Sequence, residues 1–251
     1  MVIFSCKQEL EAMLTCIYEA WASGRGHRNI RLEIEPIGQY SILDEYIHVD
    51  GDYKKAESVM RAVLEKISPT FYKEVLGSLG YYEADTLDNA YRMLLLGFKF
   101  GISTLNMMNY EVVARNMKIR KAYSREVYRF QEIARFNSLK NGMLVSHIEP
   151  RSDILENLEP IFTDRMPSEN WMIIDDNRAK TVIHPAGKHS YLRWLNEMEM
   201  ESLRRSEEEN DHYTDLWKLF FNSIAIKERT NHECQMNLFP LWARKHATEF
   251  Q

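Results

Sequence analysis

The chain has 251 residues, of which 45% are hydrophobic and 27% charged, and its formal net charge is −5. This length and apolar content allow a buried core in one large domain or two small ones. The negative net charge argues against a protein whose whole surface binds nucleic acid, so such binding requires a local basic patch.

The first 101 residues predict short strands followed by packed helices. Residues 1–5 are typical of a short buried strand, and residues 7–23 carry apolar side chains at the spacing of one helix face. Two more strands are predicted at 30–34 and 45–49. Three helices are expected between 53 and 101, with breaks near Ser68-Pro69 and at Asp85-Thr86.

The rest of the chain predicts helices separated by two hairpins. The Asn141-Gly142 pair is favoured in tight turns between antiparallel strands, and the turn at 175–178 separates two further apolar runs. The predicted elements are a long helix at 109–134, a hairpin of strands 135–139 and 142–149, a helix at 153–162, a hairpin of strands 171–174 and 180–184, and a helix at 196–226.

No Pro/Gly/Ser-rich linker, internal repeat or low-complexity tract divides the sequence. We therefore expect a single domain over 1–251, with a helical sub-region at 1–134 and a sub-region of hairpins and C-terminal helices at 135–251. The predicted fold class is α+β, rich in helix, with a small and mostly antiparallel sheet built from the hairpins.

One face of the long helix is basic. Between Arg92 and Lys140 the sequence has ten basic and three acidic residues, an excess of seven positive charges. At about 100° per residue, the side chains opposite the apolar stripe include Lys118, Lys121, Arg125 and Arg129. Rows of Lys and Arg contact phosphates without reading sequence, so these four are candidate DNA contacts. A solvated helix face explains such a row equally well.

Few residues are candidates for catalysis. His147-Ile148-Glu149-Pro150 matches the His-x-Glu half of a nucleobase deaminase, but no Cys-x-x-Cys follows it, which argues against a zinc deaminase. Asp164-Arg165 and Asp175-Asp176 could supply carboxylates for metal or acid–base chemistry, although Asp is also favoured in turns. The catalytic candidates are His147, Asp164, Arg165 and Asp175.

Cys6, Cys16 and Cys234 match neither a disulfide framework nor a zinc site, and we expect free or buried thiols. The sequence contains no signal peptide and no apolar run of the roughly 18 residues that a membrane span needs. We therefore expect a cytoplasmic protein with no membrane association, no metal and no cofactor.

The segment 227–246 crowds basic, amide and imidazole side chains around apolar ones. Its candidate nucleic-acid contacts are Lys227, Arg229, Asn231 and Gln235, since cations bind phosphates and amides can bind phosphates or base edges. The alternative is structural: the same side chains could cap and hold the last helix.

Several segments together resemble bacterial proteins described as probable DNA-metabolism proteins, which are built around a domain of unknown function numbered 4130. The segments are Ile3-Phe4-Ser5-Cys6, residues 14–21, 136–142, 147–150, 162–167 and 171–175, and the C-terminal stretch 216–250. This family often carries Asn-Pro-x-x-Gln-Arg near its C-terminus, where this chain has Asn231-His232-Glu233-Cys234-Gln235-Met236. Losing the final basic position weakens this motif as a phosphate-binding element.

The resemblance implies a partner. Members are typically encoded beside a radical-SAM protein similar to DNA-lesion lyases, and this chain lacks the Cys-x-x-x-Cys-x-x-Cys that would hold an iron–sulfur cluster. The expected function is a DNA-binding accessory protein of a radical-SAM-linked repair or modification system. Two alternatives stay open: a DNA hydrolase or glycosylase-like enzyme in its own right, and a scaffold whose acidic segment 197–211 docks a basic partner.

Overall fold

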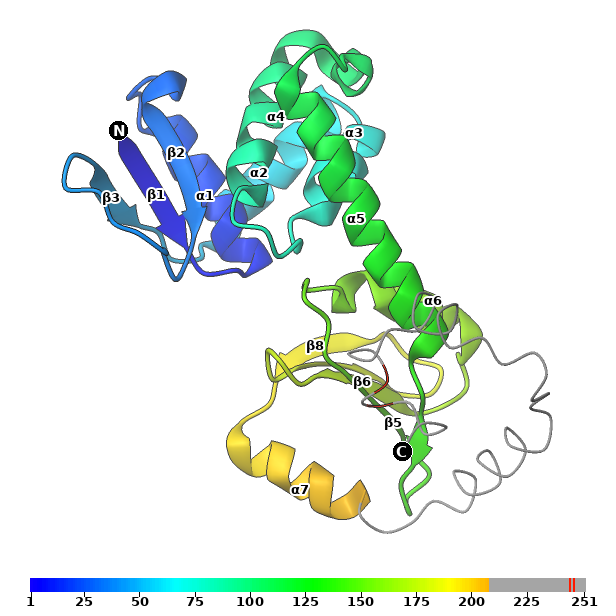
Figure 1. Cartoon of the computed structure of the whole chain (residues 1–251). Coiled ribbons are helices and arrows are strands. Elements are labelled where there is room, and N and C mark those ends of the chain that lie inside the picture. Colours follow the sequence, from blue (N-terminus) through cyan, green and yellow to red (C-terminus); the bar gives the residue numbers. More distant parts are fainter. Residues whose placement is uncertain (208–243, 245, 247–251) are drawn as a thin grey trace, which may run out of the picture. The chain divides into compact units, whose positions relative to one another are not determined.

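The computed structural model describes residues 1–207, 244 and 246. The chain divides into two compact units, Met1–Arg125 and Glu126–Gln251 (Figure 1), and each is described by itself. The division falls within one long helix, nine residues before the sub-region boundary that the sequence suggested after residue 134. None of the helices in the described part of the chain is long and apolar enough to cross a membrane.

The first unit contains a three-stranded sheet with every strand parallel to its neighbour. Its order is β2-β1-β3, and Val2 of the central strand pairs with Ile30 on one side and Glu45 on the other. The strands are β1 (Val2–Cys6), β2 (Ile30–Ile34) and β3 (Glu45–His48). All five residues of β1 are buried, as expected for a strand flanked on both edges.

Helices supply most of the first unit. The helix α1 (Leu10–Ala22) connects β1 to β2 and packs against both strands. The others are α2 (Tyr53–Lys66), α3 (Pro69–Val75), α4 (Thr86–Phe100) and the 3₁₀ turns η1 (His27–Asn29), η2 (Leu76–Ser78) and η3 (Gly101–Asn106). Ser68 ends the preceding segment and caps α3 by accepting the Phe71 N–H at 3.0 Å, and Pro69 starts the helix. The predicted break at this dipeptide is confirmed.

The helix α5 (Glu111–Ile133) begins in the first unit and ends in the second. Its buried stripe includes Ile119, Tyr123, Val127 and Phe130, which confirms the spacing predicted from the sequence.

The second unit contains a five-stranded mixed sheet in the order β4-β5-β6-β7-β8. The strands are β4 (Asn137–Ser138), β5 (Leu144–Ile148), β6 (Trp171–Asp175), β7 (Lys180–His184) and β8 (Tyr191–Trp194). Both predicted hairpins are present, since β4 and β5 pair antiparallel, as do β6 and β7. However, β5 and β6 are parallel and are joined through α6 (Leu155–Arg165).

The helix-rich α+β class is confirmed, but the prediction of a mostly antiparallel sheet is wrong. The first sheet is entirely parallel and the second is mixed. The difference arises from the connections between strands. The helices α1 and α6 are crossovers, which allow the strands on either side of them to pair parallel, whereas tight turns join antiparallel strands. The strand β8 was not predicted.

The C-terminal prediction can be followed only in part. The helix expected at 196–226 begins as α7 (Glu197–Glu207), and the rest of that range lies outside the described residues. Cys6 and Cys16 are buried free thiols, as expected, whereas Cys234 falls outside the described part.

Candidate functional site

Two carboxylates lie at the carboxyl ends of the parallel strands β5 and β6. Ile148 pairs with Asp175 in the last register position, so Glu149 and Asp176 are the first residues beyond the two strands. The Asp176 N–H donates to the Ile148 carbonyl at 3.0 Å, which keeps the two chain segments together past the end of the ladder. The carboxyl ends of parallel strands are a common place for binding sites in α/β folds.

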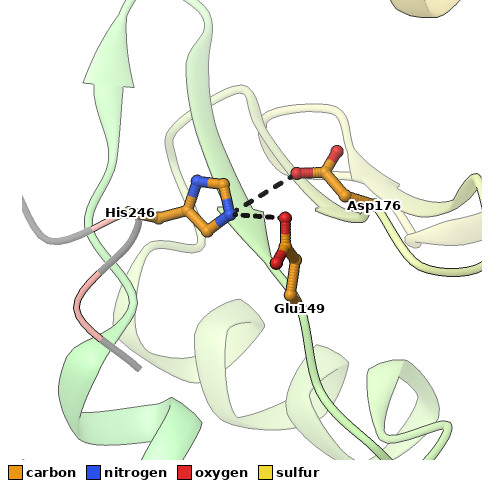
Figure 2. Close-up of side chains that lie close together, drawn as sticks. All are labelled: Glu149, Asp176 and His246. Carbon is orange, nitrogen blue, oxygen red and sulfur yellow. Dashed lines mark ion pairs between the residues drawn. The ribbon is translucent and has the colours of Figure 1, made fainter. Parts of the chain in front are cut away.

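His246 from the C-terminal end of the chain faces both carboxylates (Figure 2). Its Nε2 lies 3.3 Å from Glu149 Oε1 and 3.6 Å from Asp176 Oδ2. This Nε2 is buried and has no hydrogen-bond partner among the described residues. One ligand atom from each of the three residues lies within 4.8 Å of the other two.

His147 supports this group from β5. Its Nδ1 lies 2.9 Å and 3.0 Å from the two carboxylate oxygens of Asp176, and its ring stacks on the His246 ring with centroids 5.8 Å apart. Because an ionised carboxylate only accepts hydrogen bonds, Nδ1 of His147 carries the proton in this contact. His147 thereby fixes the orientation of Asp176.

The adjacent carboxylate, Asp175, has a structural environment. It is fully buried, and Arg178 Nη1 lies 2.8 Å from its Oδ2. Burial raises the pKa of Asp175 to about 6, against the opposing effect of Arg178. Arg178 also donates to the carbonyls of Pro150 and Arg151 at 3.2 and 2.5 Å, so the turn after β6 holds the loop that follows Glu149.

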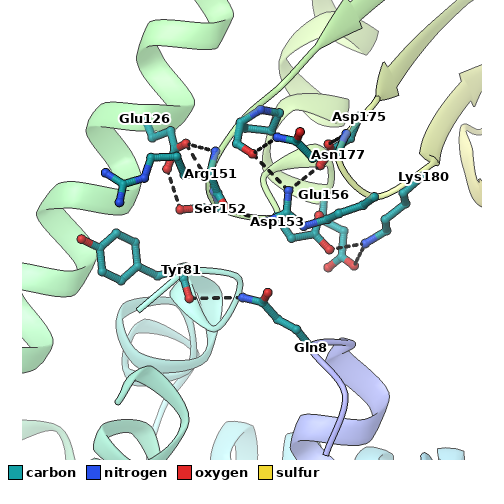
Figure 3. A network of polar contacts seen from close by, with 12 residues as sticks. Gln8, Tyr81, Glu126, Arg151, Ser152, Asp153, Glu156, Asp175, Asn177 and Lys180 are labelled. Atoms are coloured by element: carbon teal, nitrogen blue, oxygen red, sulfur yellow. Dashed lines mark hydrogen bonds and ion pairs between the residues drawn. The ribbon is translucent and has the colours of Figure 1, made fainter. Parts of the chain in front are cut away.

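The same loop is held on its other side by α5 (Figure 3). Glu126 accepts the backbone N–H of Arg151 at 2.7 Å and the Ser152 hydroxyl at 2.5 Å. Asn177 donates from its side chain to the Pro150 carbonyl at 2.9 Å. The segment carrying Glu149 is therefore fixed by hydrogen bonds directly after the strand.

The predicted DNA contacts of α5 differ in exposure. Lys118, Lys121 and Arg125 are exposed, and among the described residues none of them has an ion-pair partner. Arg129, one turn further along the helix, is half-buried. The predicted contacts Lys227, Arg229, Asn231 and Gln235 lie outside the described residues.

Other cations of this basic segment are neutralised by acidic residues that precede it in sequence. Arg92 pairs with Asp88 at 3.3 Å, and Arg120 pairs with Glu74 at 2.6 Å. Arg115 forms a bidentate contact with Asp85 and also pairs with Glu83. The positive charge that remains accessible on α5 is thus concentrated at Lys118, Lys121 and Arg125.

Of the four catalytic candidates, only His147 lies in the candidate site. His147 joins the Glu149–Asp176–His246 group, whereas Asp175 is directed to Arg178. Asp164 and Arg165 are exposed at the C-terminal end of α6, where Arg165 donates to the Gln131 carbonyl at 3.1 Å and lies over the Phe162 ring.

Three members of the group were not among the predicted catalytic residues. Glu149 appeared only as part of a deaminase-like motif, and Asp176 only as the neighbour of Asp175. Their shared signal is that each directly follows an apolar strand, which would have placed them together had the strands been recognised as parallel. His246 gave no comparable signal.

Comparison with known proteins identifies the family but no function. No curated protein matches the chain. The family model of DUF4130, a domain of unknown function, matches residues 84–249. This range includes α5, the mixed sheet, and His147, Glu149, Asp176 and His246. The chain therefore belongs to the DUF4130 family.

Proposed function

We propose that this chain is a DNA-binding accessory protein of a radical-SAM-linked repair or modification system. The observation that carries the proposal is the set of exposed cations on α5, Lys118, Lys121 and Arg125, which have no acidic partner among the described residues. Their neighbours Arg92, Arg115 and Arg120 are all engaged in ion pairs. The free cations are thus separated from those that stabilise the fold.

These three residues suit phosphate binding. They fall at steps of three and four along α5, so they share one helix face, opposite the buried stripe. Lys and Arg in such a row neutralise successive phosphates and release counterions, which gives affinity without sequence preference. This matches an accessory protein that holds DNA while a partner performs the chemistry.

The proposed partner rests on the family resemblance. A radical-SAM cluster needs three closely spaced cysteines, whereas Cys6, Cys16 and Cys234 are far apart in the sequence. In the proposed pair, the radical-SAM protein encoded nearby performs the radical chemistry and this chain binds DNA. Co-purification of the two proteins, with and without DNA, tests this division.

DNA binding is measured by fluorescence anisotropy with a labelled duplex. The triple variant Lys118→Ala/Lys121→Ala/Arg125→Ala is expected to bind at least about tenfold more weakly than the wild type at low salt. The matched control replaces three exposed lysines of α2 and α3, Lys54, Lys66 and Lys73, and makes the same change in net charge. Equal losses in both triple variants would reject a specific role for α5.

The His147–Asp176 pair with Glu149 favours a second candidate, a DNA-processing enzyme. An imidazole and two carboxylates at the end of a parallel strand pair are groups that can activate water or transfer protons. An enzyme predicts that Asp176→Asn abolishes turnover of a damaged or undamaged duplex while DNA affinity is retained. An accessory protein predicts no turnover by the wild-type chain alone.

A further inference from the structure

We infer that Glu149, Asp176 and His246 bind a divalent transition-metal ion at the carboxyl ends of β5 and β6. The three residues provide one imidazole nitrogen and two carboxylate oxygens, and a ligand atom from each lies within 4.8 Å of the others. Their exposures, 25% for Glu149, 13% for Asp176 and 27% for His246, leave the group shielded but accessible to solvent. None of the three ligands belongs to the basic row of α5, and metal binding can be measured without DNA.

The distances fit metal coordination better than direct hydrogen bonds. A charged N–H···O bond has a typical length of about 2.7–2.9 Å. The Nε2 of His246 is instead 3.3 Å and 3.6 Å from its two carboxylate oxygens. Metal–ligand bonds of about 2.1 Å in a tetrahedral site place neighbouring ligands roughly 3.4 Å apart. The two observed separations lie on either side of that value.

The charges of the group are suited to a cation. Glu149 and Asp176 bring two carboxylates close together in a partly buried place, where their mutual repulsion is stronger than in water. The Nε2 of His246 points toward both carboxylates, yet it has no hydrogen-bond partner among the described residues. A metal ion accepts the nitrogen lone pair and neutralises both carboxylates at once.

His147 occupies the position of an outer-sphere residue. Metal-binding carboxylates are commonly held by a hydrogen bond from a second side chain. The Nδ1 of His147 provides that bond to Asp176 at 2.9 Å. In addition, its ring stacks on the ring of His246. One residue thus orients two of the three ligands.

The ligand set indicates the class of metal. Imidazole favours Zn²⁺ and related transition ions, and carboxylates also accept Mn²⁺, whereas Mg²⁺ prefers oxygen ligands alone. Three protein ligands leave at least one coordination position for water, which distinguishes such a site from a closed structural site. We expect affinity to fall in the order Zn²⁺, Mn²⁺, Mg²⁺.

The first unit contains a matched group with the same residue types. His48 lies 2.7 Å from Glu35 through Nδ1 and 3.1 Å from Asp50 through Nε2. Because two different ring nitrogens face the two carboxylates, no single donor of His48 is shared between them. Both distances are those of hydrogen bonds. His48→Ala is therefore a control that removes an equivalent imidazole.

The test is isothermal titration calorimetry of the full chain, stripped with chelator and titrated with Zn²⁺. The wild type is expected to bind one ion. His246→Ala and Glu149→Ala are each expected to bind it at least about 100-fold more weakly, because each removes a ligand. His147→Ala is expected to weaken binding by roughly 10–100-fold. His48→Ala is expected to bind as the wild type does.

A measurement on the wild type covers the case in which a variant fails to fold. One equivalent of Zn²⁺ is expected to shift the imidazole NMR signals of His246 and leave those of His48 unchanged. Absence of Zn²⁺ binding, binding unaffected by His246→Ala, or an NMR shift confined to His48 would overturn the inference. DNA affinity measured in chelator remains a separate test of the proposed function.

Discussion

His147 and Asp176 are hydrogen-bonded across the carboxyl ends of two parallel strands, with Nδ1 2.9 Å from one carboxylate oxygen and 3.0 Å from the other. Both side chains are 13% exposed, so the bond is largely shielded from water. It links a residue inside β5 to the first residue beyond β6, two positions that are 29 apart in sequence.

A double-mutant cycle should detect this coupling. His147→Ala and Asp176→Asn, alone and together, are expected to show an interaction energy of about 0.5–3 kcal/mol, since the two groups contact each other directly. Urea unfolding in chelator provides the free energies without a contribution from bound metal. Strictly additive effects would mean that the contact has no energetic role.

Lys180 is a nearly buried cation of the mixed sheet. Its side chain is 8% exposed, and Nζ lies 2.7 Å from Asp153 and 3.5 Å from Glu156 (Figure 3). Removing one member of a buried ion pair takes a counter-charge away from the other, so Lys180→Ala should lower the free energy of unfolding by about 3–5 kcal/mol.

The comparison for Lys180 is an exposed ion pair in the same unit. Arg205 and Glu201 have side chains that are 74% and 56% exposed, and Arg205→Ala should change stability by less than about 0.5 kcal/mol. Lys180→Met, which keeps the apolar stem, should still destabilise, because the carboxylates lose their cation. Urea denaturation followed by circular dichroism measures all three; a neutral Lys180→Met would contradict the charge argument.

Gly97 permits close packing between α4 and α3. A Cβ at this position would lie 2.5 Å from Phe71 Cζ and 3.0 Å from Ile67 Cδ1. Gly97→Ala is therefore expected to destabilise by about 1–3 kcal/mol through overpacking, despite a helix-propensity gain of about 1 kcal/mol. At Gly77 the nearest atom to a new Cβ is Lys73 Cγ at 3.9 Å, so Gly77→Ala should not destabilise. Thermal melts of the two variants should shift unequally.

The His48–Glu35 pair predicts a pH dependence in the first unit. The hydrogen bond to Glu35, followed by that to Asp50, raises the pKa of His48 above its ordinary 6.5. The hydrogen bond from His48, followed by that from Ser5, lowers the pKa of Glu35 below 4.5. The His48 contribution to stability is complete below pH 6.5 and is lost as pH rises through the raised pKa. The Glu35 contribution is present above pH 4.5 and is lost on acidification through the lowered pKa.

An NMR titration of the His48 ring protons measures this effect directly. The wild-type midpoint should lie above 6.5 and move downward in Glu35→Gln. Glu45→Gln, at the other end of β3, should leave the midpoint unchanged. A midpoint that does not respond to Glu35→Gln would show that the pair does not set the His48 pKa.

The sequence predicted local elements well and their pairing poorly. Apolar runs at 171–174 and 180–184 identified β6 and β7. Their antiparallel pairing could also be predicted, because only a short turn separates the two strands. The pairing of β1 with β2, or of β5 with β6, brings together residues on either side of a helix. Hydrophobic periodicity does not specify such partners. The strand β8, with mostly exposed residues, has no strong alternation to detect.

Predicting the candidate site requires the same knowledge of which strands pair. Asp175 and Asp176 are adjacent in sequence, but the register of β6 buries the first against Arg178 and directs the second to His147. Composition does not distinguish them. The contribution of His246 depends on how the end of the chain returns to the sheet, which no local pattern encodes.

The salt dependence of DNA binding tests the central claim most directly. The slope of the logarithm of the binding constant against the logarithm of salt concentration should be roughly 3 units smaller in magnitude for Lys118→Ala/Lys121→Ala/Arg125→Ala than for the wild type, about one unit for each lost phosphate contact. The control triple variant at Lys54, Lys66 and Lys73 should retain the wild-type slope. A wild-type slope in the α5 variant, or no measurable DNA binding by the wild type with and without its partner, would contradict the account.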